Sequence, residues 1–220
     1  VFLFTMLAAL LKTHPTADEL QIVLSSSGLE DFIHFEGIPH LVGGKVISDA
    51  EKATELIKSV VFTEFERREK ILTDARVTNI AQYNQKCTPK LAPMVVVIDE
   101  FADLADQLET KKEKEAFFTP VKRIAQIGRK RGIHLVLCTQ RPAATLVPSN
   151  IKSQLSGRLA LRVNDANSSR MILEEGGAQY LQKHGDMIYK NGAETERAQG
   201  YFISIDELDE IVEGIKRLNE

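Results

Sequence analysis

Residues 94–103 read MVVVIDEFAD, and this segment is the most informative part of the sequence about the fold. Its apolar run, residues 94–98, is rich in β-branched side chains and predicts a strand that is buried on both faces of a sheet. Asp99 and Glu100 follow at once, so two carboxylates are expected at the carboxyl end of that strand. Ligands bind along this edge in open α/β sheets. The stretch therefore predicts an α/β fold with a candidate site at Asp99 and Glu100.

Adjacent carboxylates at such an edge fit two roles in phosphate chemistry. In P-loop nucleoside triphosphatases, the acid that closes this strand helps to hold Mg²⁺ on the nucleotide phosphates, and the next acid can polarise an attacking water. On this interpretation Asp99 serves the metal and Glu100 is the general base. The alternative is a core strand that simply leaves into solvent through two acidic residues.

A second apolar stretch, residues 134–138 (HLVLC), leads into Thr139, Gln140 and Arg141. If it forms the neighbouring strand, its polar end lies beside the carboxylates. Gln140 is then placed to sense the γ-phosphate or to orient the water, as glutamine does in other nucleotide hydrolases. A plain strand-to-loop exit, with Pro142 ending the ladder, is the alternative. The proximity of Asp99 and Glu100 favours the functional interpretation.

The basic run Arg129-Lys130-Arg131 precedes Gly132, between the two predicted strands. Cations at a helix C-terminus usually complement the helix dipole. They can also project an arginine into the nucleotide of a neighbouring subunit, where it stabilises charge in the transition state. Composition does not separate these two interpretations.

Helices and apolar strands alternate along the rest of the chain. Helices are predicted at residues 1–11, from a Ser48/Glu51 capping box to the charged stretch 66–70, from Thr119 and Pro120 to 131, at 169–175, and from a Ser204/Glu207 capping box to about 218. Strands are predicted at 20–24, 94–98, 134–138, 158–163, 186–189 and 199–203, with loops at 109–115 and 141–148. This alternation predicts one domain over residues 1–220, with a mainly parallel sheet covered by helices on both faces.

Composition restricts the function classes. The 220 residues carry a net charge of −3, so a generally basic surface that coats nucleic acid is excluded, and any DNA contact must come from a few local cations. The apolar segment 1–11 is too short to span a membrane, which needs roughly 20 residues. Two cysteines make no disulfide framework, and the five histidines show no metal-ligand spacing.

Ordered motifs along almost the whole chain resemble the motor domain of the FtsK/SpoIIIE family of DNA translocases. They are EGIPHL at 36–41, ERR at 66–68, NIA at 79–81, YN at 83–84, VIDEFADL at 97–104, GIHLVL at 132–137, TQRP at 139–142, SR at 169–170, IL at 172–173, GA at 177–178, GDM at 185–187, and Gly200, Phe202 and Ser204. Chance does not explain so many matches in one order, so the resemblance is specific.

The resemblance implies a RecA-like P-loop fold that hydrolyses ATP with Mg²⁺, in a ring, usually a hexamer, that pumps double-stranded DNA through its pore. It implies that Asp99 and Glu100 are the Walker B pair and that Gln140 is the sensor, with Thr139 beside it at the nucleotide. Arg129 matches the arginine that the family offers across the subunit interface. Finally, Arg141 and Lys152 fall in the stretch that resembles the pore loops, where phosphate contacts are expected.

Three departures from the family pattern are visible. The P-loop motif G-x-x-x-x-G-K-[ST] is absent, and the first predicted helix starts where that motif should have just ended, so this chain alone is expected to bind ATP poorly and to hydrolyse little. Residues 25–28 read SSSG where the family often has Asp-Pro-Lys, and Ala166 stands where members can carry an interface lysine.

Three functions therefore remain open. The first is an ATP-driven DNA translocase motor, towards which the TQRP motif leans. The second is a related ATPase that drives protein secretion and binds a peptide substrate, and the third is an assembly module without a P-loop. In each case a cytoplasmic location is expected, with any membrane tether outside these residues.

Overall fold

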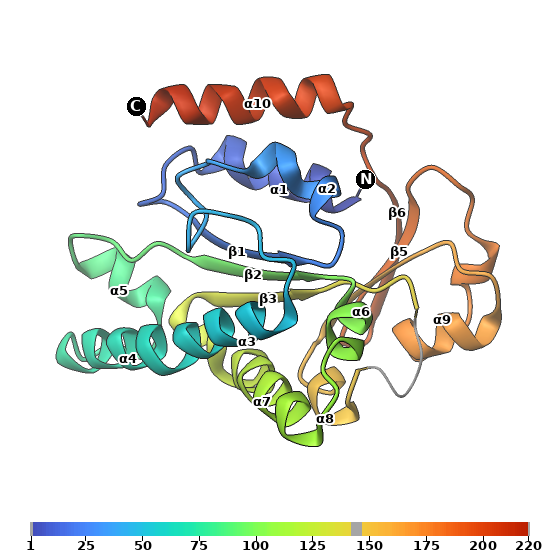
Figure 1. Cartoon of the computed structure of the whole chain (residues 1–220), viewed down its shortest axis with the longest axis horizontal. Coiled ribbons are helices and arrows are strands. Elements are labelled where there is room, and N and C mark those ends of the chain that lie inside the picture. The colour runs from blue at the N-terminus through green and yellow to red at the C-terminus, as the bar shows by residue number, and fades with distance from the viewer. Residues whose placement is uncertain (1, 142–146, 220) are drawn as a thin grey trace.

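The computed structural model describes residues 2–141 and 147–219, and its centre is a parallel sheet of three strands (Figure 1). Strand β1 (Gln21–Ser26), β2 (Met94–Asp99) and β3 (Ile133–Leu137) lie in the order β1-β2-β3. The register pairs Ser26 with Asp99 and Ile98 with Leu137. All three strands thus end at the same edge, as the sequence predicts for the strands that lead to Glu100 and Gln140.

Helices cover both faces of this sheet (Figure 1). Helix α1 (Phe2–Thr13) and helix α10 (Ile205–Leu218) lie on one face, and α3 (Ala50–Ser59) and α7 (Lys111–Ile127) lie on the other. Alternate residues of β2 serve the two cores: Val95 and Val97 pack towards α1 and α10, while Val96 and Ile98 pack towards α3 and α7. A strand that is buried on both sides needs an unbroken apolar run, which explains the sequence of β2.

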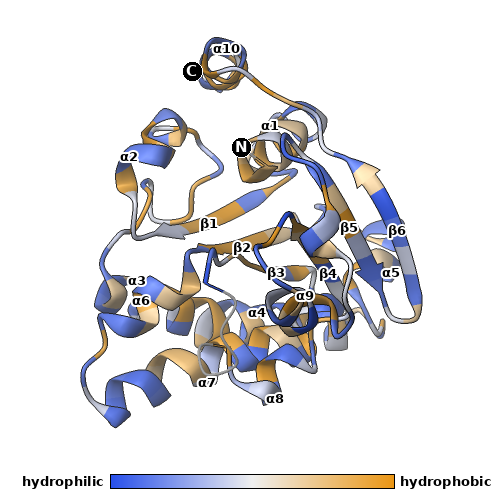
Figure 2. Cartoon of the chain, turned by 90° about the vertical axis from the view of Figure 1, so that its right-hand side faces the viewer, coloured by the Kyte–Doolittle hydropathy of each residue, from blue (hydrophilic) through white to orange (hydrophobic). Residues whose placement is uncertain are grey.

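The other strands form a separate antiparallel sheet, β4-β5-β6, so the prediction of one mainly parallel sheet is right only for β1–β3. Its strands are β4 (Gly157–Leu161), β5 (Asp186–Asn191) and β6 (Glu194–Gln199), and helix α9 (Ala166–Leu173) packs against β4. Strand β6 is exposed throughout and mainly hydrophilic (Figure 2), and it precedes the predicted 199–203. Residues 200–204 are not a strand.

Short elements connect the layers. They are α2 (Leu29–Phe32), a 3-10 turn (Ile33–Phe35), a π-helical turn (Val60–Glu64), α4 (Phe65–Asp74), α5 (Ile80–Lys86), α6 (Phe101–Asp106), a 3-10 turn called η3 (Gly128–Arg131), α8 (Ser149–Lys152) and a 3-10 turn (Ala178–Tyr180). No helix in the described ranges is long and apolar enough to cross a membrane.

Two predicted helix starts were wrong. Asp49, not Ser48, caps α3, because its carboxylate accepts a hydrogen bond from the Lys52 amide; the helix then continues through the π-helical turn into α4. Most of the predicted loop at 109–115 belongs to α7, which begins at Lys111 and is opened by a capping box of Thr110 and Glu113. Pro120 therefore lies inside α7 rather than at its start. The Ser204/Glu207 capping box of α10 is confirmed.

A carboxylate–guanidinium pair ties the antiparallel sheet together and makes its stability depend on pH. Arg197 donates hydrogen bonds to both carboxylate oxygens of Asp186, at 2.9 and 2.6 Å, and the Gln182 amide donates a third at 2.6 Å. These bonds, that of Arg197 foremost, lower the pKa of Asp186 to about 2. A lowered folded-state pKa stabilises the fold above the unfolded value near 3.9, and the gain is lost as the pH falls towards about 2.

We therefore expect Asp186→Asn to lower the melting temperature at neutral pH and the deficit to shrink between about pH 4 and pH 2. Thermal unfolding measured across this pH range checks the expectation. A deficit that is the same at every pH would contradict it.

Candidate active site

The carboxylates lie where β2 passes into α6, at a backbone turn that is unusual for a residue other than glycine. Glu100 has φ 44° and ψ 62°, in the left-handed region. Backbone hydrogen bonds fix this turn against β3: the Phe101 amide donates to the Cys138 carbonyl, and the Cys138 amide donates to the Ile98 carbonyl, each at 2.9 Å. Such conformations cost about 1–3 kcal/mol and cluster at functional sites. The neighbouring strand therefore holds Glu100 in place.

Glu100 is buried, with 7% of its surface exposed, and both its carboxylate oxygens have partners. The Thr139 hydroxyl donates to Oε1 at 2.8 Å, and the backbone amide of Gln140 donates to Oε2 at 2.6 Å. A carboxylate has about four acceptor positions, so it keeps capacity to accept a hydrogen bond from water. The predicted meeting of Glu100 with the end of β3 is confirmed.

Asp99 lies one residue earlier and faces β1. The Ser26 hydroxyl donates to its Oδ2 at 3.1 Å. Burial raises the pKa of Asp99 above its usual range; Ser26 opposes this shift, and the charges of Glu100 and Asp31 add to it. A carboxylate whose charged form is disfavoured in this way is stabilised by a nearby cation.

The carboxylate chemistry fits Mg²⁺. The described residues hold no group of three or more acidic, histidine or cysteine side chains that would form an all-protein metal cage. Mg²⁺ usually takes one or two carboxylates and completes its octahedron with waters and substrate phosphates. Asp99 is suited to this role. Neighbouring Cys138 supplies no charge, because burial and the two carboxylates raise the pKa of its thiol to about 12.

The remaining residues of the TQRP motif have different environments. Within the described ranges the side-chain amide of Gln140 makes no hydrogen bond, while Arg141 forms ion pairs with Asp103 and, at 3.0 Å, with Asp106, both in α6. Arg141 thus has its charge balanced at the carboxylate edge. Pro142 lies outside the described residues.

Lys152 and Arg129 are not beside the carboxylates. Lys152 ends α8, beyond residues 142–146, and is half-buried. Arg129 lies in η3, before β3 begins, and is exposed. Because β2 and β3 are parallel, Arg129 is at the opposite edge of the sheet from Glu100, on the order of 20 Å away along the strands at about 3.3 Å per residue. It therefore cannot serve the carboxylates of its own chain.

Two serines of the SSSG stretch were missed as contributors to the site. Ser26 hydrogen-bonds to Asp99, and Ser27 donates to Asp103 at 3.4 Å. The signal that would have found them is the register of two buried strands, since both β1 and β2 end in polar residues at one edge. Where the family often has a lysine, this chain therefore places hydroxyl groups against the carboxylates.

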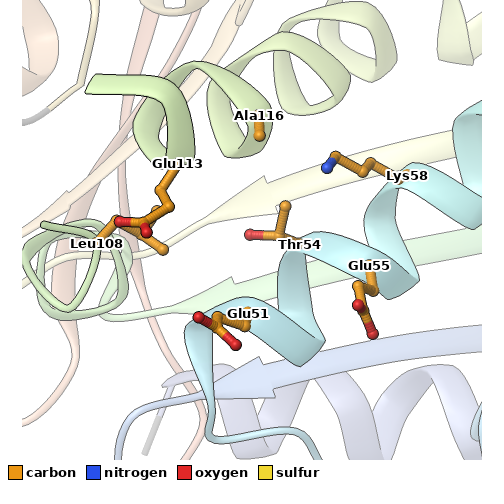
Figure 3. A pocket seen from close by; sticks show the side chains of 7 residues that line it. All are labelled: Glu51, Thr54, Glu55, Lys58, Leu108, Glu113 and Ala116. Carbon is orange, nitrogen blue, oxygen red and sulfur yellow. The ribbon is translucent and has the colours of Figure 1, made fainter. Parts of the chain in front are cut away.

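A pocket of about 190 Å³ lies elsewhere, between α3 and α7 (Figure 3). It is lined by Glu51, Thr54, Glu55, Lys58, Leu108, Glu113 and Ala116, and neither Asp99 nor Glu100 reaches it. Glu113 is engaged in the capping box of α7, and the Thr54 hydroxyl donates to the Ala50 carbonyl. These two polar side chains of the pocket are therefore engaged within the fold itself.

Curated relatives are similar to this chain over nearly its full length. A DNA translocase FtsK of Helicobacter pylori strain J99 is 36% identical over 98% of the chain, and that of Halalkalibacterium halodurans is 34% identical over 93%. The matched regions cover 25% and 26% of these relatives, so the chain spans about a quarter of their length.

Solved structures share the fold. The conjugation coupling protein TcpA of pCW3, determined as a monomer with ATPγS, superposes with a TM-score of 0.80 at 26% identity, over 97% of this chain and 59% of that one. The cytoplasmic domain of the type VII secretion ATPase EccC of Thermomonospora curvata gives a TM-score of 0.76 at 22% identity, over 96% of this chain and 26% of that one.

The family itself is shown by the sequence. The model of the FtsK/SpoIIIE family matches residues 1–144, a stretch that includes β1 to β3, both carboxylates and the Thr139-Gln140 pair. The resemblance inferred from the motifs is thereby confirmed: this chain belongs to the FtsK/SpoIIIE family.

Proposed function

We propose that this chain supplies the metal-site acid and the general base of an ATP-driven motor that moves double-stranded DNA. The observation that carries the proposal is the meeting of Asp99, Glu100, Thr139 and Gln140 at the carboxyl edge of three parallel strands. Curated relatives named DNA translocase FtsK support the choice of DNA as substrate. The ATPγS in the TcpA structure supports ATP as the nucleotide.

Each residue has a role that follows from its surroundings. Bound Mg²⁺ would neutralise charge on the nucleotide phosphates, with Asp99 holding it directly or through water. Glu100 accepts a hydrogen bond from the attacking water and orients it. Thr139 and the Gln140 amide fix the Glu100 carboxylate, and burial keeps bulk water from competing with it. The Gln140 side chain is proposed to contact the γ-phosphate or the same water.

The nucleotide also needs a phosphate-binding loop, and these 220 residues contain no P-loop motif. Helix α1 begins at the edge of the sheet where strand β2 ends (Figure 1). A phosphate-binding loop joined to the start of α1 would therefore lie beside Asp99 and Glu100. Hydrolysis is accordingly a property that we propose for the intact protein and not for these residues alone.

Two further roles belong to an assembled ring, for which a hexamer is our expectation. Arg129, at the opposite edge of the sheet from Glu100, is proposed to serve the nucleotide of the adjacent subunit. Arg141 and Lys152 are proposed to contact DNA phosphates, although Arg141 must first leave Asp103 and Asp106 or share them.

The substrate is tested by measuring ATP turnover of the intact protein with duplex DNA and, separately, with secretion-signal peptides. We expect DNA to stimulate turnover and the stimulation to fall steeply with rising salt, because phosphate contacts release counterions. Stimulation by a peptide and not by DNA would replace this proposal with a secretion ATPase. No turnover under either condition would favour an assembly module.

A further inference from the structure

The basic residues of the turn that carries Arg129 have different surroundings. In η3, Arg129 and Lys130 are exposed, and within residues 2–141 and 147–219 Arg129 forms no ion pair. Arg131 turns inward instead: its guanidinium lies 5.3 Å from the ring centre of Phe65 and donates to Glu69 at 2.6 Å. The two arginines of the basic run therefore differ: Arg131 packs against its own chain, and Arg129 is available to a partner.

Arg68 of α4 holds the end of this turn. It is the largest fully buried side chain in the described ranges, with 1% of its surface exposed. Its Nη1 donates to the Arg131 carbonyl at 2.7 Å and approaches the Gly132 carbonyl at 3.5 Å. Carbonyls at a helix end lack partners within the helix and carry partial negative charge. Arg68 thus satisfies and fixes the backbone two residues after Arg129.

A buried guanidinium needs a counterion, and Glu64 provides it. Its Oε1 accepts from Arg68 Nε, while Arg67 donates to both oxygens of Glu64 at 2.7 Å. Glu64 ends the π-helical turn, which sets it one helical turn before Arg68. Burial opposes the charge on Glu64, but its bonds to the two arginines outweigh this and lower its pKa. Because Arg68 is buried, removing Glu64 would leave its guanidinium without a counterion.

Two glycines of this turn are packed so closely against their neighbours that neither position has space for a side chain. A Cβ at Gly128 would lie 2.4 Å from the Ile133 carbonyl oxygen. A Cβ at Gly132, which has φ +68°, would lie 2.4 Å from the Ile80 side chain of α5. The ERR and NIA motifs thereby meet at one turn, through Arg68 and Ile80. The proposed function leaves both motifs unexplained.

We propose that Arg68 is a positioning residue for Arg129. The ERR segment acts by fixing the backbone of η3, and with it the position and direction of the Arg129 side chain. The inference rests on the proposed action of Arg129 at the neighbouring subunit's nucleotide. An arginine that reaches across an interface is effective only when its backbone is held rigidly, because a misplacement of about 1 Å can cost about 10²-fold in rate.

Arg68→Lys in the intact protein tests this role. Lysine keeps the charge beside Glu64 but lacks the guanidinium fork that reaches the carbonyls at the same time. We expect kcat for ATP to fall about 10- to 100-fold with an unchanged KM. Arg67→Lys is the matched control, because Arg67 binds the same Glu64 but is half-exposed, and both its hydrogen bonds go to Glu64 rather than to η3. It should stay within about twofold of wild type, as most surface changes do.

A double-mutant cycle separates positioning from general stability. In an Arg129→Ala background, the Arg68→Lys change should cost less than about twofold, because the group that it positions is gone. An equal loss in both backgrounds, or no loss in wild type, would overturn the inference. Wild-type turnover in Arg129→Ala alone would instead refute the proposed role of Arg129. Should Arg68→Lys not fold, Glu64→Gln, which loosens Arg68 without removing it, takes its place in the same cycle.

Discussion

Replacing Arg129 by alanine in the intact protein is expected to lower kcat for ATP by about 10³-fold or more, the range measured for arginines that stabilise transferring phosphates. Nucleotide affinity should change little, because Arg129 is not beside the carboxylates of its own chain. Steady-state turnover and equilibrium binding of ATP give the two numbers. Lys130→Ala is the matched control, since Lys130 is an exposed cation on the same turn.

Mixed assemblies show whether Arg129 acts in the neighbouring subunit. In a mixture of Arg129→Ala and Glu100→Gln subunits, some sites combine an intact Glu100 with an intact Arg129 from the next subunit. Turnover of the mixture should therefore rise well above that of either variant alone. If the mixture stays as inactive as its parts, or if Lys130→Ala loses as much as Arg129→Ala, the assignment across the interface is wrong.

Glu100→Gln is expected to lower kcat by about 10²- to 10⁴-fold, the usual contribution of a general base. Glutamine keeps the size of the side chain and one oxygen that can accept from Thr139, but it loses the negative charge that polarises water. Binding of ATP should persist, so the loss appears in turnover and not in affinity. Rapid-quench measurement of the hydrolysis step separates it from product release.

The control for this variant is Asp106→Asn. Asp106 is a half-exposed carboxylate at the same edge, paired with Arg141, and it does not contact Glu100. Its removal changes the local charge by the same amount. Equal losses in the two variants would mean that the net charge of the edge matters and that Glu100 has no special role.

The sequence predicted the parallel core well because its signals are local. The run of residues 94–98 serves two cores at once, so no polar residue interrupts it. Parallel strands also share an edge, so the sequence predicts that Glu100 and Thr139 lie close together, and their hydrogen bond confirms it. Their spacing along the chain gave no hint of the left-handed backbone at Glu100, which contacts with the Cys138 segment impose.

Elements with exposed charge were predicted less well. The first turn of α7 reads as a charged loop because its residues face solvent, and a proline nine residues later imitates a helix start. Strand β6, ETERAQ, is exposed along its whole length and shows no apolar alternation. The pattern instead favours residues 199–203, where Tyr201 and Phe202 are apolar in character yet 86% and 77% exposed.

The position of Arg129 relative to Glu100 could not be predicted from its motif. Its resemblance to the family's interface arginine supplied a role, but only the topology puts it on the edge opposite Glu100. The contacts of Arg68 with the carbonyls after Arg129 were likewise invisible, since 63 residues separate the two partners of that hydrogen bond. Long-range pairs of this kind follow from packing and not from spacing.

The position of a bound nucleotide tests the assignment of Asp99 and Glu100 more directly than any substitution. A structure of the intact protein with Mg²⁺ and a non-hydrolysable ATP analogue should place the terminal phosphate at the carboxyl ends of β1–β3, with Asp99 on the metal side and Glu100 facing the γ-phosphate. A nucleotide that binds elsewhere, with these two carboxylates left facing solvent or protein alone, would contradict the account.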